Sequence, residues 1–141
     1  MNAEADSLAA QAYDARRNGD VERSIDAYRR AAELFADDGY PLREAHALRH
    51  VGDILRGQSK LEEALPYYER ALALYETHSE RADLDRGNAL RGYALLIELL
   101  GRDAHPIWVQ TREIYSAVGV EAGIAECDRH LGESESSGKT P

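Results

Sequence analysis

The chain has 141 residues, 43% of them apolar, and a formal net charge of −9. This size suits one ordinary domain with a continuous core, and the acidic balance argues against a nucleic-acid partner, because binding to a phosphate backbone needs a local excess of Lys and Arg. The single cysteine, Cys127, excludes an intramolecular disulfide and suits a reducing compartment.

The N-terminal residues do not contain the apolar core of a signal peptide. No stretch of the chain approaches the roughly 18 consecutive apolar residues of a membrane span. The sequence therefore predicts a cytoplasmic protein that is not inserted in a membrane.

The first predicted unit covers about residues 4–38 and contains two helices. A turn sequence, Asn18-Gly19-Asp20, interrupts the apolar pattern between them. The first of these helices carries Leu8 among several alanines and is expected to bury little. The second places the aromatic Tyr28 four residues after the small Ser24.

The second predicted unit, about residues 42–78, has the clearest helical periodicity. One apolar stripe at spacings of i, i+3, i+4 and i+7 consists of Leu48, Val51, Gly52 and Leu55. A second stripe runs from Leu61 to Tyr75, and Gly57-Gln58-Ser59 separates the two. Each stripe is typical of one face of an amphipathic helix, so this unit is predicted to be a helical hairpin.

The third predicted unit, about residues 84–118, needs a choice of register. A strict offset of 40 would bury Asn88, Arg91, Gly92 and Glu98 in its first helix. Sliding this helix by two residues favours a buried face of apolar side chains instead: Ala89, Leu90, Tyr93, Ala94, Leu96, Ile97 and Leu100. The connection around Gly101 is then expected to be two residues shorter than the connection around Gly57.

A last helix is predicted at residues 121–132, because Arg129-His130-Leu131-Gly132 repeats Arg49-His50-Val51-Gly52 at an offset of 80. A lone terminal helix can cap the open end of a repeat stack. Residues 133–141 include no apolar side chain and are predicted to be a disordered tail. The predicted domain therefore covers residues 1–132.

The aromatic side chains Tyr28, Tyr68 and Trp108 recur at a spacing of 40, each four residues after a small one. Such a fixed period marks a repeat array. Short side chains let helices approach where they cross, and the three aromatic residues are interpreted as plugs that fill the adjacent gap. The predicted fold is all-α, with about three stacked helical hairpins and a C-terminal capping helix.

The second unit, with Leu48-(x)2-Val51-Gly52-(x)2-Leu55 followed by Ala64-(x)3-Tyr68-(x)2-Ala71-Leu72, resembles the tetratricopeptide repeat family. Its long period resembles the variant found in kinesin light chains and in bacterial repeat-built sensor domains. The resemblance covers about residues 4–132. It implies a right-handed superhelix whose concave groove, lined by the first helices, receives a peptide or a partner helix.

The resemblance also implies which side chains line such a groove. The predicted groove residues are Tyr13, Arg16, His46, Arg49, Asp53, Arg56, Asn88, Arg91, Leu95 and Arg129. Under the chosen register Arg49, Arg91 and Arg129 occupy equivalent positions, which suits the carboxylates of an acidic peptide. The alternative interpretation is that these arginines are paired with Asp53, Glu98 and Glu126.

Catalytic and metal chemistry have little support in the sequence. His46 and His50 have the i, i+4 spacing of paired zinc ligands, but no motif supplies a third and a fourth ligand. Cys127 shares an apolar stripe with Ile124 and Leu131 and is interpreted as a buried small residue. No phosphate loop or nucleophile elbow is present, so neither an enzyme, a metal nor a cofactor is predicted.

The leading hypothesis is accordingly a protein-interaction adaptor that binds a protein or peptide partner, with an acidic one favoured by the arginines. A second hypothesis is a self-associating scaffold, a homodimer, suggested by Leu95 and Leu99. A third is a sensor for a signalling peptide or small ligand.

Overall fold

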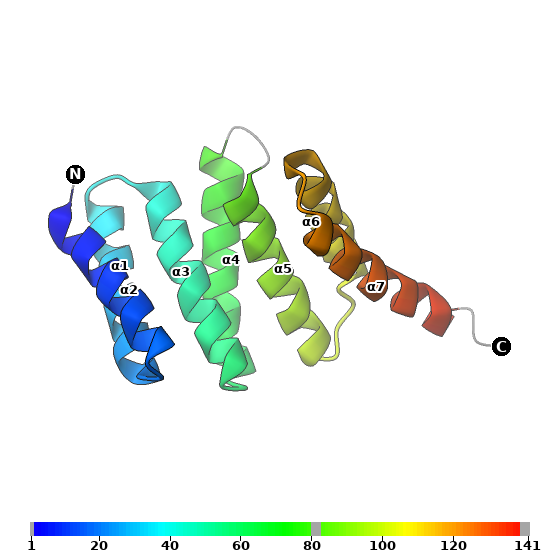
Figure 1. The fold of residues 1–141 in the computed structure, drawn as a ribbon, viewed down its shortest axis with the longest axis horizontal. Coiled ribbons are helices and arrows are strands. Elements are labelled where there is room, and N and C mark those ends of the chain that lie inside the picture. The colour runs from blue at the N-terminus through cyan, green and yellow to red at the C-terminus, as the bar shows by residue number, and fades with distance from the viewer. Residues whose placement is uncertain (1, 80–82, 139–141) are drawn as a thin grey trace. The chain divides into compact units, whose positions relative to one another are not determined.

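The computed structural model describes residues 2–79 and 83–138, with residues 133–138 described by their backbone alone. Over these residues it contains seven α-helices and no strand (Figure 1). The predicted all-α class is confirmed. The chain divides into two compact units, Met1–Ser79 and Glu80–Pro141. The single domain over residues 1–132 and the tail from residue 133 stay predictions.

Unit 1 consists of two helical hairpins. Its helices are α1 (Ala3–Arg17), α2 (Val21–Asp37), α3 (Pro41–Gly57) and α4 (Leu61–His78). Consecutive helices pack against each other, α1 on α2, α2 on α3 and α3 on α4. The two hairpins cover residues 3–37 and 41–78.

The predicted plugs of unit 1 form its core. Tyr28 and Tyr68 are buried. A Cβ placed on Gly52 would lie 3.0 Å from the Tyr68 ring, so the glycine makes room for this plug. Ser24 is also buried, and its hydroxyl donates to the Ala12 carbonyl oxygen at 2.7 Å. Because this bond satisfies the hydroxyl, a small polar side chain is tolerated at the crossing of α1 and α2.

Unit 2 contains one hairpin and a further helix. Its helices are α5 (Leu84–Leu99), α6 (His105–Val118) and α7 (Glu121–Gly138). α6 packs on both α5 and α7. The backbone of α7 continues to Gly138, beyond the cap predicted at residues 121–132, since no proline interrupts it. Residues 139–141 of the predicted tail lie outside the described residues.

The two-residue slide in α5 is largely confirmed. Five of the seven residues assigned to its inner face are buried: Ala89, Leu90, Ala94, Leu96 and Ile97. Tyr93 and Leu100 are only half-buried. Gly92, which the slide had moved outward, is also buried, so the prediction is wrong at that residue. With no side chain to place, a glycine gives no periodic signal of the face it occupies.

The connection between α5 and α6 also differs from the prediction. It runs over residues 100–104, whereas the connection between α3 and α4 runs over residues 58–60. The expectation of a shorter connection is wrong because α6 begins only at His105. Pro106 lies in the first turn of α6, where its missing N–H costs nothing. Its counterpart Pro66 lies inside α4.

A residue with a left-handed backbone conformation, that is, a positive φ, lies just after each of five helices in the described part of the chain. Gly19, Gly39, Gly101 and Gly119 have φ between 74° and 80°, and Ser59 has φ of 61°. This conformation ends a helix by turning the chain away, and glycine adopts it without a steric penalty.

None of the helices in the described residues combines the length and the apolar character needed to cross a bilayer.

Candidate functional site

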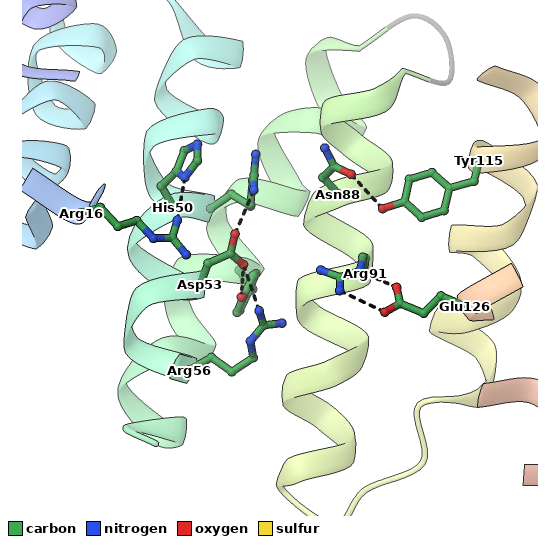
Figure 2. Close-up of polar contacts among 10 residues, drawn as sticks. Arg16, His50, Asp53, Arg56, Asn88, Arg91, Tyr115 and Glu126 are labelled. Carbon is green, nitrogen blue, oxygen red and sulfur yellow. Dashed lines mark hydrogen bonds and ion pairs between the residues drawn. The ribbon is translucent and has the colours of Figure 1, made fainter. Parts of the chain in front are cut away.

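On the α1/α3 surface of unit 1, His50 is held by three neighbours. Its imidazole stacks on Tyr28, with ring centroids 4.8 Å apart and planes inclined by 5°. Its Nδ1 lies 3.3 Å from Nη1 of Arg16 in the last turn of α1 (Figure 2), and its Nε2 lies 3.1 Å from Nε2 of His46. A guanidinium can only donate, so Nδ1 of His50 accepts and its Nε2 donates to His46. The polar chain links α1 to α3.

One helical turn along α3, Asp53 gathers three donors, here called the Asp53 network. Nη1 of Arg49 lies 2.9 Å from Oδ2 of Asp53, and the hydroxyl of Tyr68 donates to Oδ1. Arg56 adds a longer ion pair at 3.9 Å (Figure 2). Burial, followed by the charge of Asp53, raises the pKa of Tyr68. The phenol therefore remains a neutral donor over the ordinary pH range.

The Asp53 network is largely covered, whereas the end of α1 is not. The side chains of Arg49 and Asp53 are 13% and 11% exposed. Tyr13 is 54% exposed, and the guanidinium of Arg17 lies 5.9 Å above its ring. Arg16 is likewise exposed. Of the residues predicted in unit 1, Tyr13 and Arg16 are therefore the most accessible to a partner.

In unit 2, Arg91 of α5 and Glu126 of α7 form a bidentate ion pair (Figure 2). Nη2 of Arg91 lies 3.0 Å from Oε2 of Glu126, and Nε bonds Oε1. Burial alone raises the pKa of Glu126, but the hydrogen bond and charge of Arg91, with the charges of His130 and Arg129, outweigh it and lower the pKa below its usual value. The pair therefore stabilises the carboxylate.

A pocket of about 360 Å³ surrounds this pair and is here called the Arg91 pocket. Its lining residues are Asn88, Arg91, Tyr115, Val120, Ala122, Gly123, Glu126 and Arg129. Asn88 Oδ1 accepts a hydrogen bond of 2.8 Å from the Tyr115 hydroxyl (Figure 2). Three predicted groove residues, Asn88, Arg91 and Arg129, thus share one pocket. Leu95 is half-buried and does not line it.

Glu98 has a different role from the one suggested by the sequence. Its Oε1 accepts from the indole Nε1 of Trp108 at 2.6 Å and lies 2.9 Å from Nδ1 of His130. Arg49 pairs with Asp53 and Arg91 with Glu126, as the alternative interpretation supposed. Glu98 does not pair with an arginine among the described residues; it contacts Trp108 of α6 and His130 of α7.

Sequence reasoning did not predict the ring stacking of His50 and His130. They occupy equivalent positions 80 residues apart, and each stacks on the aromatic plug 22 residues before it. The His130–Trp108 centroids are 4.1 Å apart and the planes are inclined by 14°. The shared Arg-His sequence marks the position; the aromatic partner of each histidine is visible only once the helices are placed.

No group of three or more His, Cys, Asp or Glu side chains in the described residues is arranged to hold a metal ion. Cys127 is buried, as predicted. Burial raises the pKa of its thiol to about 11, and the charges of Glu126 and Asp128 add to this. A protonated, buried thiol is a poor nucleophile.

A model described as tetratricopeptide repeat matches residues 3–77, which is more than half of the chain. The chain belongs to the tetratricopeptide repeat family. The family resemblance seen in the sequence is thereby confirmed. Tetratricopeptide repeats are generally non-catalytic scaffolds, and membership indicates a protein-interaction or scaffold module.

Among solved structures, the repeat protein is similar to the crystal structure of BtubC (BKLC) from P. vanneervenii, with a TM-score of 0.62 and 14% sequence identity. The match covers 97% of this chain and 66% of that chain, so the present chain spans just under two thirds of its length. At this identity the likeness shows the fold alone. No curated protein matches the sequence.

Proposed function

We propose that the protein is a non-catalytic interaction module whose α1/α3 surface binds an acidic segment, either an extended peptide or a helix, of another protein. The observation that carries this proposal is the exposure of Tyr13, Arg16 and Arg17 together at the end of α1. In a chain with a net charge of −9, two exposed guanidinium groups here lie within one helical turn of an exposed aromatic ring.

The charge balance of the surface favours a carboxylate partner. Asp53 lies on the same face of α3 as the histidines, but Arg49 and Arg56 pair with it. The arginines of α1 are therefore not offset by that carboxylate. A guanidinium binds a carboxylate through two parallel hydrogen bonds, and an exposed tyrosine offers a rigid contact surface.

The side chain of Arg16 on this surface is already restrained in the free protein. Arg16 contacts His50, which stacks on the buried ring of Tyr28. Ordering a long side chain on binding costs about 0.5–1.5 kcal/mol, and a contact that already restrains Arg16 reduces this cost. The polar chain from α1 to α3 thus supports binding at this surface.

A peptide-display selection against the intact protein tests the proposal. The selected peptides are expected to be rich in Asp and Glu, and the double variant Arg16→Glu, Arg17→Glu is expected to bind them about tenfold or more weakly. The double variant Arg23→Glu, Arg30→Glu on α2 is the matched control, since both arginines are exposed and the two substitutions also change the charge by four. Neutral selected peptides, or equal losses in the variant and the control, would refute the assignment.

Self-association is a second candidate, and Leu99 is the residue that favours it, with 59% of its surface exposed at the end of α5. Sedimentation velocity over a concentration series separates the two candidates. A homodimer that Leu99→Glu dissociates would support self-association. A monomer at about 100 μM would exclude a dimer of that affinity.

A further inference from the structure

We propose that the Arg91 pocket of unit 2 is a second carboxylate-binding site, which the Glu126 side chain occupies in the free protein and which a carboxylate of a bound peptide takes over. The inference rests on the proposed function only for the peptide nature of the ligand. The site itself lies in unit 2 and is tested separately from the α1/α3 surface.

The geometry of the pocket already shows how a carboxylate is held there. Both oxygens of Glu126 bond the guanidinium of Arg91, which is the arrangement that an acidic side chain or a chain terminus would adopt. Asn88 uses its Oδ1 for the Tyr115 hydroxyl, and its amide N–H groups donate to none of the described residues. These N–H groups of Asn88 could donate to an oxygen atom of a ligand.

The pocket can also admit a second carboxylate before the first one leaves. Its volume is about 360 Å³, and Arg129 at its edge is exposed, without an ion pair to any of the described residues. Among the side chains that line the pocket, two carry a guanidinium group and one a carboxylate. The side chain of Arg91 is 40% exposed, which leaves it within reach of a partner. The lowered pKa of Glu126 indicates that the pocket favours an anion.

Chemical rescue tests the carboxylate site without any knowledge of the natural ligand. Glu126→Ala removes the resident carboxylate, and acetate is then expected to raise the Tm of this variant in a saturable manner over chloride at equal ionic strength. Wild type and the double variant Arg91→Ala, Glu126→Ala are expected to show no such difference. Glu126→Ser, which also leaves the position of the carboxylate open, replaces Glu126→Ala if circular dichroism shows a loss of helix. An equal response of all variants to acetate would overturn the site.

Exchange with a peptide is tested with hexaglutamate as the probe and hexaglutamine as its uncharged control. The measurements use the Arg16→Glu, Arg17→Glu background, so that the α1/α3 surface does not contribute. Removing Glu126 is expected to tighten hexaglutamate binding about tenfold, and removing Arg91 is expected to abolish the gain. Equal binding with and without Glu126 would overturn the exchange, whatever the α1/α3 surface does.

Discussion

The ring of Tyr115 lies so close to Gly123 that a Cβ on Gly123 would stand 2.5 Å from Cδ2 of the ring. On the other side, a Cβ on Gly87 would stand 2.9 Å from Cε1 of the same ring. The buried tyrosine is thus wedged between α5 and α7, and two glycines make this packing of unit 2 achievable.

Gly123→Ala is therefore expected to destabilise the protein, by about 1–3 kcal/mol, because the ring is buried and cannot move aside without cost. Urea unfolding followed by circular dichroism measures this. Gly132→Ala, in the same helix but with nothing within 4 Å of the added Cβ, is the control. It is expected to be neutral or to stabilise by up to about 1 kcal/mol through helix propensity. Equal effects of the two substitutions would contradict the wedge.

Ser59 occupies a left-handed position that glycine fills after α1, α2, α5 and α6. A residue with a Cβ is strained there by roughly 1–2 kcal/mol, and the greater freedom of glycine in the unfolded chain offsets part of the gain. Ser59→Gly is expected to stabilise the protein by about 0.5–1 kcal/mol. Thermal unfolding would show a higher Tm, whereas Ser59→Ala, which retains the Cβ, should give no comparable increase.

Glu126 should make the stability of the protein sensitive to acid. Its folded-state pKa is lowered, so its contribution is fully present above the ordinary glutamate pKa of about 4.3. This contribution is lost as the pH falls through the lowered folded value. The stability difference between wild type and Glu126→Gln, on the order of 1 kcal/mol at pH 7, should therefore shrink between about pH 5 and pH 3. Urea unfolding at several pH values tests this, and a difference that persists at low pH would contradict it.

Cys127 should make the stability of the protein sensitive to alkaline pH. Burial raises the pKa of its thiol to about 11, above the value of about 8.5 in an unfolded chain. The stability from this neutral thiol is fully present below about pH 8.5 and is lost as the pH rises toward the folded value. Between pH 8 and pH 10 the free energy of unfolding of wild type is therefore expected to fall by more than that of Cys127→Ala. Urea unfolding of both proteins at the two pH values measures this difference.

The same burial predicts slow labelling of the native protein. As the chain has one cysteine, a thiol reagent reports on Cys127 alone. Its reaction at pH 7.5 is expected to be fast in urea and limited by local opening of α7 without it. Equally fast labelling in both conditions would show that the thiol is accessible in the folded state.

The fold could be predicted from the sequence because burial follows spacing along each helix. Tyr28, Tyr68 and Trp108 recur at one interval, and all three are buried. The side-chain pairs could not be predicted in the same way. That Arg91 meets Glu126 depends on how α7 is placed against α5, and the spacing of residues along each helix does not specify this placement. The stacking of His50 on Tyr28 and of His130 on Trp108 depends on helix placement for the same reason.

The hydroxyl of the Tyr68 plug donates to the largely covered carboxylate of Asp53, so that a change at either residue affects the other. A change at Asp53 would remove the carboxylate to which the buried phenol donates, and a change at Tyr68 would remove one of the donors that hold Asp53. Diversification of this protein toward new partners is therefore expected to proceed at the end of α1. There Tyr13, Arg16 and Arg17 can vary while the core stays intact.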